Sequence, residues 1–481
     1  MGTQGDDRRL YPNLTHDLVV VVPGIMGSEL YDTVRRRTLW GASVPLLLRS
    51  WLDGAPLRDL ALDERETAGE YGRVRPTRLL RLPEWLPFLR GAEPYTRLVD
   101  AARGCVVDPR ALLEFPYDWR LPVGHNSGLL GTSVLAALER WRATPEHEGA
   151  RRRHPTGRPA MVVMVAHSMG GLLARQAAAI PGMRELIRAV VTLGTPFHGS
   201  LKAAALLNTG VGLPVPLPSH RPLASLGRPD ADDGVRALAA TLPGLYDLLP
   251  RFRCVDDGGD GRHLTCADVR ALGGDPDHTE AWASRQTATV GTLDDHRLVL
   301  GGAQPTPQSL RLSDGVVTLL HTELGTSRSN RYGDGTVPTG SAELPGLRPV
   351  RFAQQHQDLA RADAVLREVT RTLRERDLDQ LGPPLGDDEG VGVEVPDTPV
   401  AAGLEWTATV RGVSRPSEVE AAVVALSNGH RRVPWPVEIR DGSVQVPVTL
   451  PAPGLYRLEL TSRAGIISQV VLAGPSSGAH G

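Results

Sequence analysis

The stretch Met161–Gly171, MVVMVAHSMGG, places a serine between an apolar run and two glycines. The run Met161–Val165 has the length and the β-branched content of a strand that is buried on both faces, as in a parallel sheet. The next stretch, Gly170–Ala179, is rich in residues that favour a helix and predicts one that packs closely on the sheet. Ser168 is therefore expected on a sharp turn between a strand and a helix.

Small residues around Ser168 permit such a turn. Ala166 and Gly170 occupy the outer positions of a G-x-S-x-G pattern, with Ala in place of the first Gly. In this kind of turn the serine lies at a helix N-terminus, where free N–H groups stabilise developing negative charge. The alternative is a serine that only caps the helix, because Ser is a favoured N-cap residue. The motif indicates catalysis only if a base and an acid accompany it.

A candidate acid and a candidate base follow the serine in the chain. Asp334 lies between two glycines in RYGDGTVP, and His356 precedes a predicted helix in RFAQQHQDL. Taken singly, the first also fits an ordinary Asp-Gly turn and the second a surface histidine. His167 and His198 compete as the base, but His167 adjoins the nucleophile and should point away from it, and His198 precedes the acid. The chain order Ser, Asp, His favours His356, with Asp358 as the alternative acid.

The roles of these residues follow from the chemistry of acyl transfer. His356 would accept the Ser168 proton and later donate it to the leaving group, while Asp334 would fix the tautomer of the imidazole. The tetrahedral oxyanion needs N–H donors that contribute about 3 kcal/mol each. We expect the N–H of Met169, directly after the serine, and that of Ile25, in PGIMGS, to be these donors.

Length and composition bound the class of protein. The 481 residues exceed one typical domain, and the net charge of −2 gives no reason to expect a nucleic-acid partner. Lys202 is the only lysine, which we interpret as compositional bias. Of three cysteines, Cys254 and Cys266 would bridge a loop only in an oxidising compartment. The N-terminus lacks an apolar signal core and no apolar run has transmembrane length, so we expect a cytoplasmic protein.

The sequence contains no strong metal or cofactor motif. Neither H-E-x-x-H nor a paired C-x-x-C occurs. Asp230, Asp232, Asp233 and Gly234 resemble the start of a Ca²⁺ loop, but no glutamate occupies the closing position. We therefore expect a solvated loop at these residues, and neither a metal nor a cofactor in the protein.

Strand-like runs alternate with helical stretches over the first part of the chain. The strand-like runs are Asp17–Gly24, Ala189–Leu193, Ala288–Val290 and Val316–Leu320, and the helical stretches include Ser133–Arg142 and Leu359–Glu375. This alternation predicts a mostly parallel sheet that is covered by helices on both faces. Residues 200–295 are rich in Pro, Gly and Asp and predict an inserted cap.

Composition changes again after Arg376. Residues 380–389, QLGPPLGDDE, have the composition of a linker, which predicts few contacts between the parts it joins. Short alternating runs follow, and the hairpin turns Asn428-Gly429 and Asp441-Gly442 predict an immunoglobulin-like β-sandwich. The predicted organisation is a tail (1–16), an α/β domain (17–379) with a cap at about 200–295, a linker (380–392), a β-sandwich (393–475) and a tail (476–481).

Five stretches together resemble a known family. VVVVPGIMGSEL, FPYDWRLP, VAHSMGG, TLGTPFHGS and YGDGTVP, in this order, are similar to the lecithin:cholesterol acyltransferase family, which includes phospholipases A and related acyltransferases. The resemblance covers most of the α/β domain and none of the sandwich. It implies an α/β-hydrolase fold, and it matches the family's triad and oxyanion donors at Ser168, Asp334, His356, Ile25 and Met169. In the PYDWR segment we interpret Asp118 and Arg120 as an internal ion pair rather than as catalytic groups.

The sequence therefore predicts a serine acyl hydrolase or O-acyltransferase that acts on lipid or other acyl esters through an acyl-Ser168 intermediate. Apolar runs in the cap predict a pocket for the acyl chain, and a lipid substrate would entail transient contact with a membrane surface. The rival prediction is a catalytically inactive binding or scaffold protein on a hydrolase fold, whose β-sandwich recruits a partner. A third is an effector whose lipase domain attacks membranes.

Overall fold

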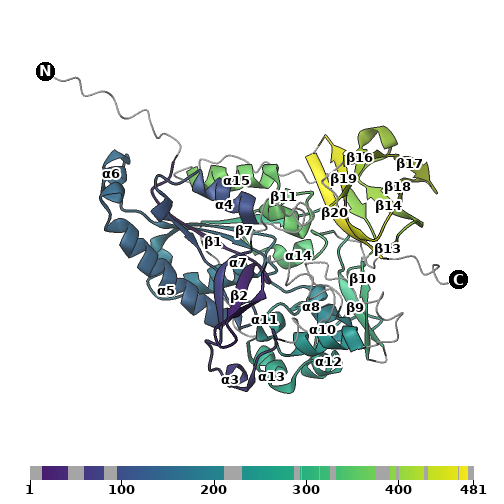
Figure 1. Ribbon diagram of the computed structural model, residues 1–481, viewed down its shortest axis with the longest axis horizontal. Coiled ribbons are helices and arrows are strands. Elements are labelled where there is room, and N and C mark those ends of the chain that lie inside the picture. Colours follow the sequence, from purple (N-terminus) through teal and green to yellow (C-terminus); the bar gives the residue numbers. More distant parts are fainter. Residues whose placement is uncertain are drawn as a thin grey trace.

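The computed structural model describes residues 14–41, 59–80, 95–210, 230–285, 293, 295–313, 315–324, 332–374, 391–396, 400–426, 432–463 and 465–474. Its centre is a six-stranded sheet (Figure 1), formed in sheet order by β11 (Val350–Phe352), β8 (His296–Gly301), β7 (Ile187–Leu193), β6 (Val162–His167), β1 (Leu18–Val22) and β5 (Leu112–Glu114).

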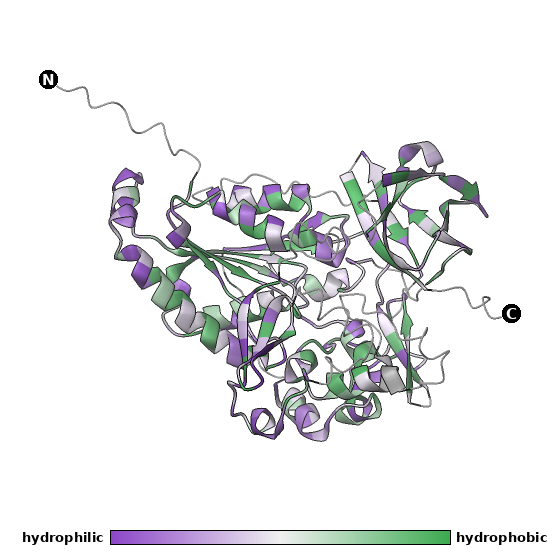
Figure 2. Cartoon of the chain, viewed as in Figure 1, coloured by the Kyte–Doolittle hydropathy of each residue, from purple (hydrophilic) through white to green (hydrophobic). Residues whose placement is uncertain are grey.

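All neighbouring strands of this sheet are parallel. β1 reads LVVVV and all five residues are buried. Because successive side chains point to opposite faces, a fully buried strand must be covered on both sides. Figure 2 shows the central strands as hydrophobic and the flanking helices as a mixture of hydrophobic and hydrophilic residues. The strands predicted around β1, β6 and β7 are confirmed.

Two pairs of helices cover the two faces of the sheet. α5 (Val123–Arg142) packs against α7 (Met169–Ala178), and α4 (Tyr95–Arg103) packs against α15 (Asp363–Arg374). The two pairs lie on opposite sides of the strands (Figure 1). The remaining short helices of this part are α3 (Glu64–Thr67), η3 (Pro109–Ala111), α6 (Pro145–Arg153), η4 (Arg184–Leu186), α14 (Thr339–Ala342) and η5 (His356–Ala360). Elements β1 to α15 are called the hydrolase domain below.

Several strands differ from the prediction. The run Ala288–Val290 lies outside the described residues, and the strand that pairs with β7 is β8, which was not predicted. The run Val316–Leu320 is a strand, β10, but among the described strands its one partner is β9 (Ser309–Ser313), with which it forms an antiparallel hairpin. An antiparallel sheet of β3 (Arg37–Trp40), β2 (Ser28–Asp32) and β4 (Val74–Leu79) was also not predicted.

The described part of the predicted cap consists of helices and a non-helical stretch at residues 247–265. It contains α8 (Leu201–Thr209), α10 (Asp230–Ala240), α11 (Pro243–Tyr246), α12 (Cys266–Ala271) and α13 (Pro276–Arg285). The prediction of a solvated loop at Asp230–Gly234 is wrong, because these residues begin α10. The helix buries an apolar face that includes Val235 and Ala239. Cys254 and Cys266 are free thiols.

The C-terminal part is a sandwich of two sheets, called the sandwich below. One sheet has the order β12-β14-β18-β17 and the other the order β13-β20-β19-β15-β16. The strands are β12 (Gly392–Glu394), β13 (Val400–Ala401), β14 (Glu405–Arg411), β15 (Glu420–Ala425), β16 (Arg432–Trp435), β17 (Glu438–Arg440), β18 (Ser443–Thr449), β19 (Gly454–Ser462) and β20 (Gly465–Gly474), with η7 (Pro416–Glu418) between β14 and β15. Their inward side chains form a separate core of valines, leucines and alanines.

The turn at Asp441-Gly442 is confirmed as the hairpin between β17 and β18. Asp441 has φ 49° and Gly442 has φ 73°, the left-handed values that a two-residue hairpin requires. Asn428-Gly429 lies outside the described residues. Together the parallel sheet, the cap and the sandwich confirm the predicted class, an α/β-hydrolase fold with an inserted cap and a C-terminal β-sandwich.

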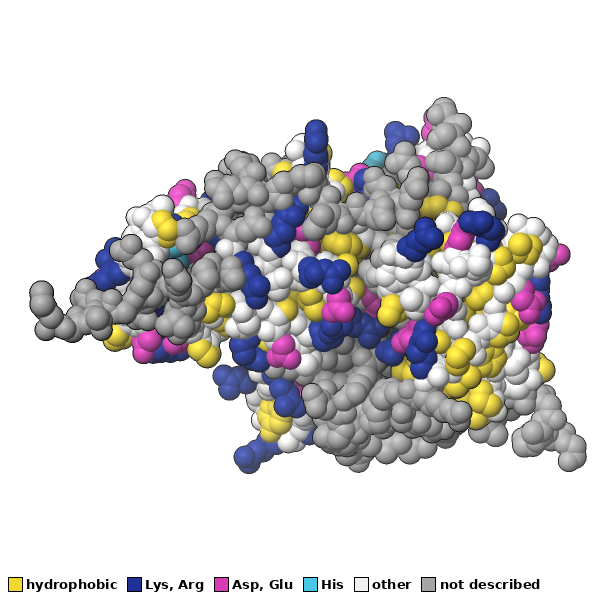
Figure 3. Space-filling view, turned by 90° about the horizontal axis from the view of Figure 1, so that it is seen from above, with side chains coloured by type: hydrophobic (Ala, Val, Ile, Leu, Met, Phe, Trp, Pro, Cys, Tyr) yellow, Lys and Arg dark blue, Asp and Glu magenta, His cyan; other side chains and the backbone are white. Residues whose placement is uncertain are grey.

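The surface has areas of mixed charge and a hydrophobic area over the sandwich (Figure 3). On the face in Figure 3, basic and acidic side chains lie beside one another, and hydrophobic side chains gather over the sandwich. Leu404, Ile439 and Ile466 of the sandwich are each more than half exposed. Among the helices of the described segments, none combines the length and the apolar character that crossing a bilayer requires.

Candidate active site

Ser168 occupies a strained turn at the end of β6. The strand ends at His167 and α7 begins at Met169, so a single residue reverses the chain direction. Ser168 has φ 53° and ψ −127°, a conformation that costs a non-glycine residue about 1–3 kcal/mol. The Ser168 N–H donates to the Leu193 carbonyl at the end of β7 (2.8 Å), which helps to hold the turn.

Two glycines after the serine let α7 approach the neighbouring chain closely. A Cβ at Gly170 would overlap the carbonyl oxygen of Pro23, in the loop after β1. A Cβ at Gly171 would overlap the side chain of Thr195, in the loop after β7. The Gly-Gly pair is therefore required by packing around the turn, as expected for a nucleophile elbow.

Ser168, His356 and Asp334 meet at the carboxyl edge of the sheet. The Nε2 atom of His356 lies 2.8 Å from Ser168 Oγ, and its Nδ1 atom lies 2.6 Å from Asp334 Oδ2. Because a carboxylate can only accept, Nδ1 carries the hydrogen, and Nε2 is left to accept the Ser168 proton. All three residues are buried. The structure thus brings together the three residues that the sequence predicted, which follow β6, β10 and β11 in the chain.

The Asp334 carboxylate is oriented by the backbone around it. Its Oδ1 atom accepts the N–H groups of Thr336 (2.9 Å) and Val337 (2.7 Å), which leaves Oδ2 for His356. The backbone N–H of His356 also donates to the Asp334 carbonyl (2.8 Å). The alternative acid, Asp358, instead accepts a hydrogen bond from Ser468 Oγ (2.7 Å), so its carboxylate is engaged elsewhere.

Tyr95 and His167 connect the loop after β1 with residues 353–361, which contain His356 and are called the histidine loop below. The Gly24 N–H donates to the Tyr95 hydroxyl (2.7 Å), which lies 2.9 Å from His167 Nδ1. His167 Nε2 lies 2.9 Å from the His356 carbonyl oxygen, so Nε2 carries the hydrogen and Nδ1 accepts from Tyr95. Burial, with His356 nearby, lowers the pKa of His167 to about 3 and keeps the ring neutral. The sequence excluded His167 as the base but did not predict this role.

The two predicted oxyanion donors flank the serine. Ile25 lies in a turn that is closed by a hydrogen bond from the Gly27 N–H to the Gly24 carbonyl (3.0 Å). Met169 is the first residue of α7, where backbone N–H groups have no partner within the helix. Within the described residues, neither the Ile25 N–H nor the Met169 N–H donates a hydrogen bond to another group of the protein. The oxyanion role of these two N–H groups stays a prediction.

A mainly apolar cavity of about 90 Å³ opens beside Ser168. Its apolar walls include Met26, Val337, Ala203, Leu206, Leu245 and Leu248. The last four belong to the cap. Lys202, the only lysine of the chain, also lines this cavity. The competing base His198 is not among the described residues that line it.

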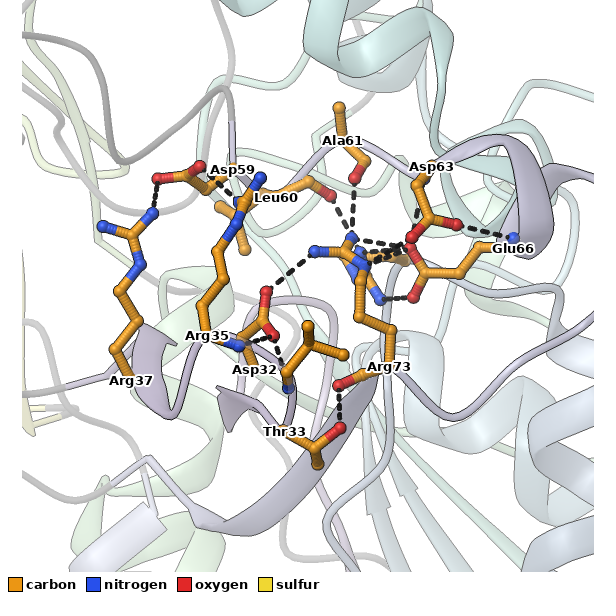
Figure 4. Close-up of polar contacts among 12 residues, drawn as sticks. Asp32, Thr33, Arg35, Arg37, Asp59, Leu60, Ala61, Asp63, Glu66 and Arg73 are labelled. Carbon is orange, nitrogen blue, oxygen red and sulfur yellow. Dashed lines mark hydrogen bonds and ion pairs between the residues drawn. The ribbon is translucent and has the colours of Figure 1, made fainter.

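Asp118 and Arg120 form the internal ion pair that the sequence predicted. Arg120 is fully buried, and its Nη2 atom lies 2.7 Å from both Asp118 Oδ2 and Glu66 Oε1. Glu66 in turn pairs with Arg73 (2.6 Å), which also contacts Asp32 (3.0 Å). Figure 4 shows Arg73 between Asp32 and Glu66. The network ties the antiparallel sheet and α3 to the PYDWR segment, and none of its residues lines the cavity beside Ser168.

Comparisons with known proteins agree with the fold. Residues 151–206, which contain β6, Ser168, α7 and β7, match the model of a family described as PGAP1-like alpha/beta domain. No curated protein matches the chain significantly. The lecithin:cholesterol acyltransferase family stays a prediction, because the model that matches is a different one.

Three solved structures are similar to the chain. A chain of the Tle4–Tli4 complex is 18% identical with a TM-score of 0.47, covering 75% of this chain and 99% of that one. Mature lipase BlEst2 from Bacillus licheniformis is 12% identical (TM-score 0.33, 75% and 92% covered). Phospholipase PlaB from Legionella pneumophila is 11% identical (TM-score 0.29, 95% and 90% covered). With TM-scores below 0.5, these similarities assign no role to any residue of this chain.

Proposed function

We propose that the protein is a serine acyl hydrolase for esters with an apolar acyl chain, and that Ser168, His356 and Asp334 are its catalytic triad. The observation that carries this proposal is the hydrogen-bonded series from Ser168 Oγ through His356 to Asp334, at the wall of a mainly apolar cavity. An inactive scaffold would not need to keep a strained serine aligned with a buried histidine and carboxylate.

The first half of the reaction forms an acyl-enzyme. Ser168 Oγ attacks the ester carbonyl carbon while His356 Nε2 takes the hydroxyl proton, and Asp334 stabilises the resulting imidazolium. The N–H groups of Ile25 and Met169 donate to the oxyanion of the tetrahedral intermediate. When that intermediate collapses, His356 returns the proton to the departing alcohol, and the acyl group remains on Ser168.

The second half releases the acyl group. His356 takes a proton from water, the resulting hydroxide attacks the acyl carbon, and Ser168 Oγ leaves with the proton from the imidazolium. An acceptor alcohol in place of water would give O-acyl transfer by the same steps. The product distribution with and without an alcohol acceptor, measured by mass spectrometry, distinguishes hydrolysis from transfer.

The acyl specificity is tested with p-nitrophenyl esters of increasing chain length, below their micelle concentrations. Each CH₂ that enters the apolar cavity contributes about 0.8 kcal/mol, or about fourfold in kcat/KM, until the cavity is filled. We expect kcat/KM to rise from acetyl to medium or longer chains. Ser168→Ala should keep the fold and lose the activity with every ester. A flat or falling series would contradict an acyl pocket and favour a hydrolase of small esters.

A further inference from the structure

Gln304 connects three parts of the molecule. Its backbone pairs with Gly333, the residue before the acid Asp334, through the Gln304 N–H (3.0 Å) and the Gly333 N–H (3.1 Å). Its side chain is fully buried. The side-chain Nε2 donates to the carbonyls of Val391 (3.3 Å) and Ala353 (3.4 Å). The loop that holds the acid is therefore fixed to the segment before His356 and to the first strand region of the sandwich.

The side-chain oxygen of Gln304 also bonds to both the histidine loop and the sandwich. Its Oε1 accepts from Gln355 Nε2 (3.0 Å) and from the Val393 N–H (3.3 Å). A glutamine side chain offers two N–H donors and two acceptor sites, and all four are used here. Two of the partners, Val391 and Val393, belong to the sandwich. The other two, Ala353 and Gln355, belong to the histidine loop. An apolar side chain of similar size would leave all of these partners without their bonds.

β20 of the sandwich holds the other side of the histidine loop. Ser468 Oγ donates to Asp358 Oδ2 (2.7 Å), two residues after His356. Arg361 Nη2 donates to Ser468 Oγ (3.1 Å), and Gln354 Nε2 donates to the Ile466 carbonyl (3.1 Å). His356 is thus flanked on both sides by residues that are bonded to the sandwich.

Asp334, His167 and Gln304 of the hydrolase domain bond to this loop, but the strand that leads to it is short. The strand that leads to His356, β11, has three residues, and within the described part of the chain it is an edge of the central sheet and pairs only with β8. A catalytic base must be held within about 0.5 Å of its productive position. The sandwich therefore supplies contacts to the histidine loop that a short edge strand lacks.

We propose that the sandwich is a positioning module for the acid–base pair, acting through Gln304 and Ser468. This inference rests on the proposed function of Ser168, His356 and Asp334. Ser468 and Gln304 touch no reacting atom. They set the positions of the two loops that carry His356 and Asp334, so the sandwich is part of the catalytic unit rather than an independent appendage.

The test uses four variants of the full chain. Ser468→Ala removes the hydrogen bonds to Asp358 and Arg361, and Ser468→Thr retains a hydroxyl that can restore them. Gln304→Met removes the side-chain bonds of Gln304 at similar volume. Ser443→Ala is the matched control, because the Ser443 hydroxyl bonds only to Arg440 and Gln445 within the sandwich in the described part of the chain.

Two measurements separate positioning from general stability. With a p-nitrophenyl ester, Ser468→Ala should lower kcat by about tenfold, the order expected for loss of a hydrogen bond to a charged group, while KM stays within about twofold. Ser468→Thr should recover kcat, and Ser443→Ala should match the wild type. Amide hydrogen exchange should become faster over residues 353–361 and 333–337 in Ser468→Ala and Gln304→Met, and stay unchanged in Ser443→Ala.

The outcomes also separate this inference from the proposed function. A wild type that neither hydrolyses esters nor reacts with a fluorophosphonate refutes the proposed function. An active wild type with unchanged kcat and unchanged exchange in Ser468→Ala refutes the positioning role, as does an equal loss in Ser443→Ala. If Gln304→Met does not fold, Ser468→Ala decides, because its single lost oxygen lies outside the sandwich core. The exchange measurement needs no activity, so it tests the loop contacts in either case.

Discussion

The Tyr95 hydroxyl is expected to stabilise the folded protein strongly, and Tyr95→Phe measures its contribution. The substitution removes one oxygen and leaves the Gly24 N–H and His167 Nδ1 without the partner that each has in the structure. Leaving one buried polar group unsatisfied costs about 1–3 kcal/mol, so two such groups give about 2–6 kcal/mol. That is a large part of the 5–15 kcal/mol that is typical of a folded domain.

Tyr117→Phe is the matched control. Tyr117 is also buried, but within the described residues its hydroxyl has no hydrogen-bond partner. Its removal should change the free energy of unfolding by less than about 0.5 kcal/mol or stabilise the protein, since a buried hydroxyl without a partner is unfavourable. Urea unfolding followed by tryptophan fluorescence gives the change in the free energy of unfolding for both variants. The comparison requires that this free energy depends on urea concentration with the same slope in the wild type and in both variants. Equal effects of the two substitutions would refute the reasoning.

Three further predictions concern the site. Asp334→Asn should lower kcat by about 10⁴-fold, because the amide favours the wrong His356 tautomer; a loss of tenfold or less, or a larger loss in Asp358→Asn, would point to the other carboxylate. The pKa of His167 is lowered from its usual 6.5 to about 3, so the unfolded chain binds more protons between these values, and stability should fall as pH drops from about 6.5 towards 3. Urea midpoints across that range should fall less steeply for His167→Gln, and parallel pH curves would count against a buried neutral ring. Lys202→Met should lower kcat/KM for anionic phospholipid esters relative to neutral esters by about two- to fivefold, the scale of a partly exposed ion pair. An equal change with both substrates would show that Lys202 does not contact a headgroup.

Local sequence patterns predicted the centre of the fold and the geometry around the serine. The buried run of valines and the small residues beside Ser168 determine β1, β6 and the turn into α7, because close packing allows few alternatives there. The chain order of Ser168, Asp334 and His356 was enough to select three residues that meet in space. Their catalytic roles and the oxyanion roles of Ile25 and Met169 stay predictions until activity is measured.

Contacts between distant segments were not predictable from these patterns. Tyr95 and Gln304 lie in stretches without a motif, and each acts through hydrogen bonds to residues far along the chain. The linker composition predicted few contacts between the two domains, and hence a folded hydrolase domain after truncation at about Gly382. The structure differs, because Gln304 and Ser468 join the domains beside His356. A linker's composition describes the linker and gives no information on the surfaces that it brings together.

Covalent labelling tests the nucleophile most directly. The full chain is treated with a fluorophosphonate, its intact mass is measured, and the modified residue is located by peptide mapping. We expect one adduct, on Ser168, none in Ser168→Ala, and a much slower reaction in His356→Ala, because Nε2 of His356 activates the hydroxyl at 2.8 Å. A wild-type protein that forms no adduct, or forms it on another residue, would contradict the assignment of Ser168 as the nucleophile.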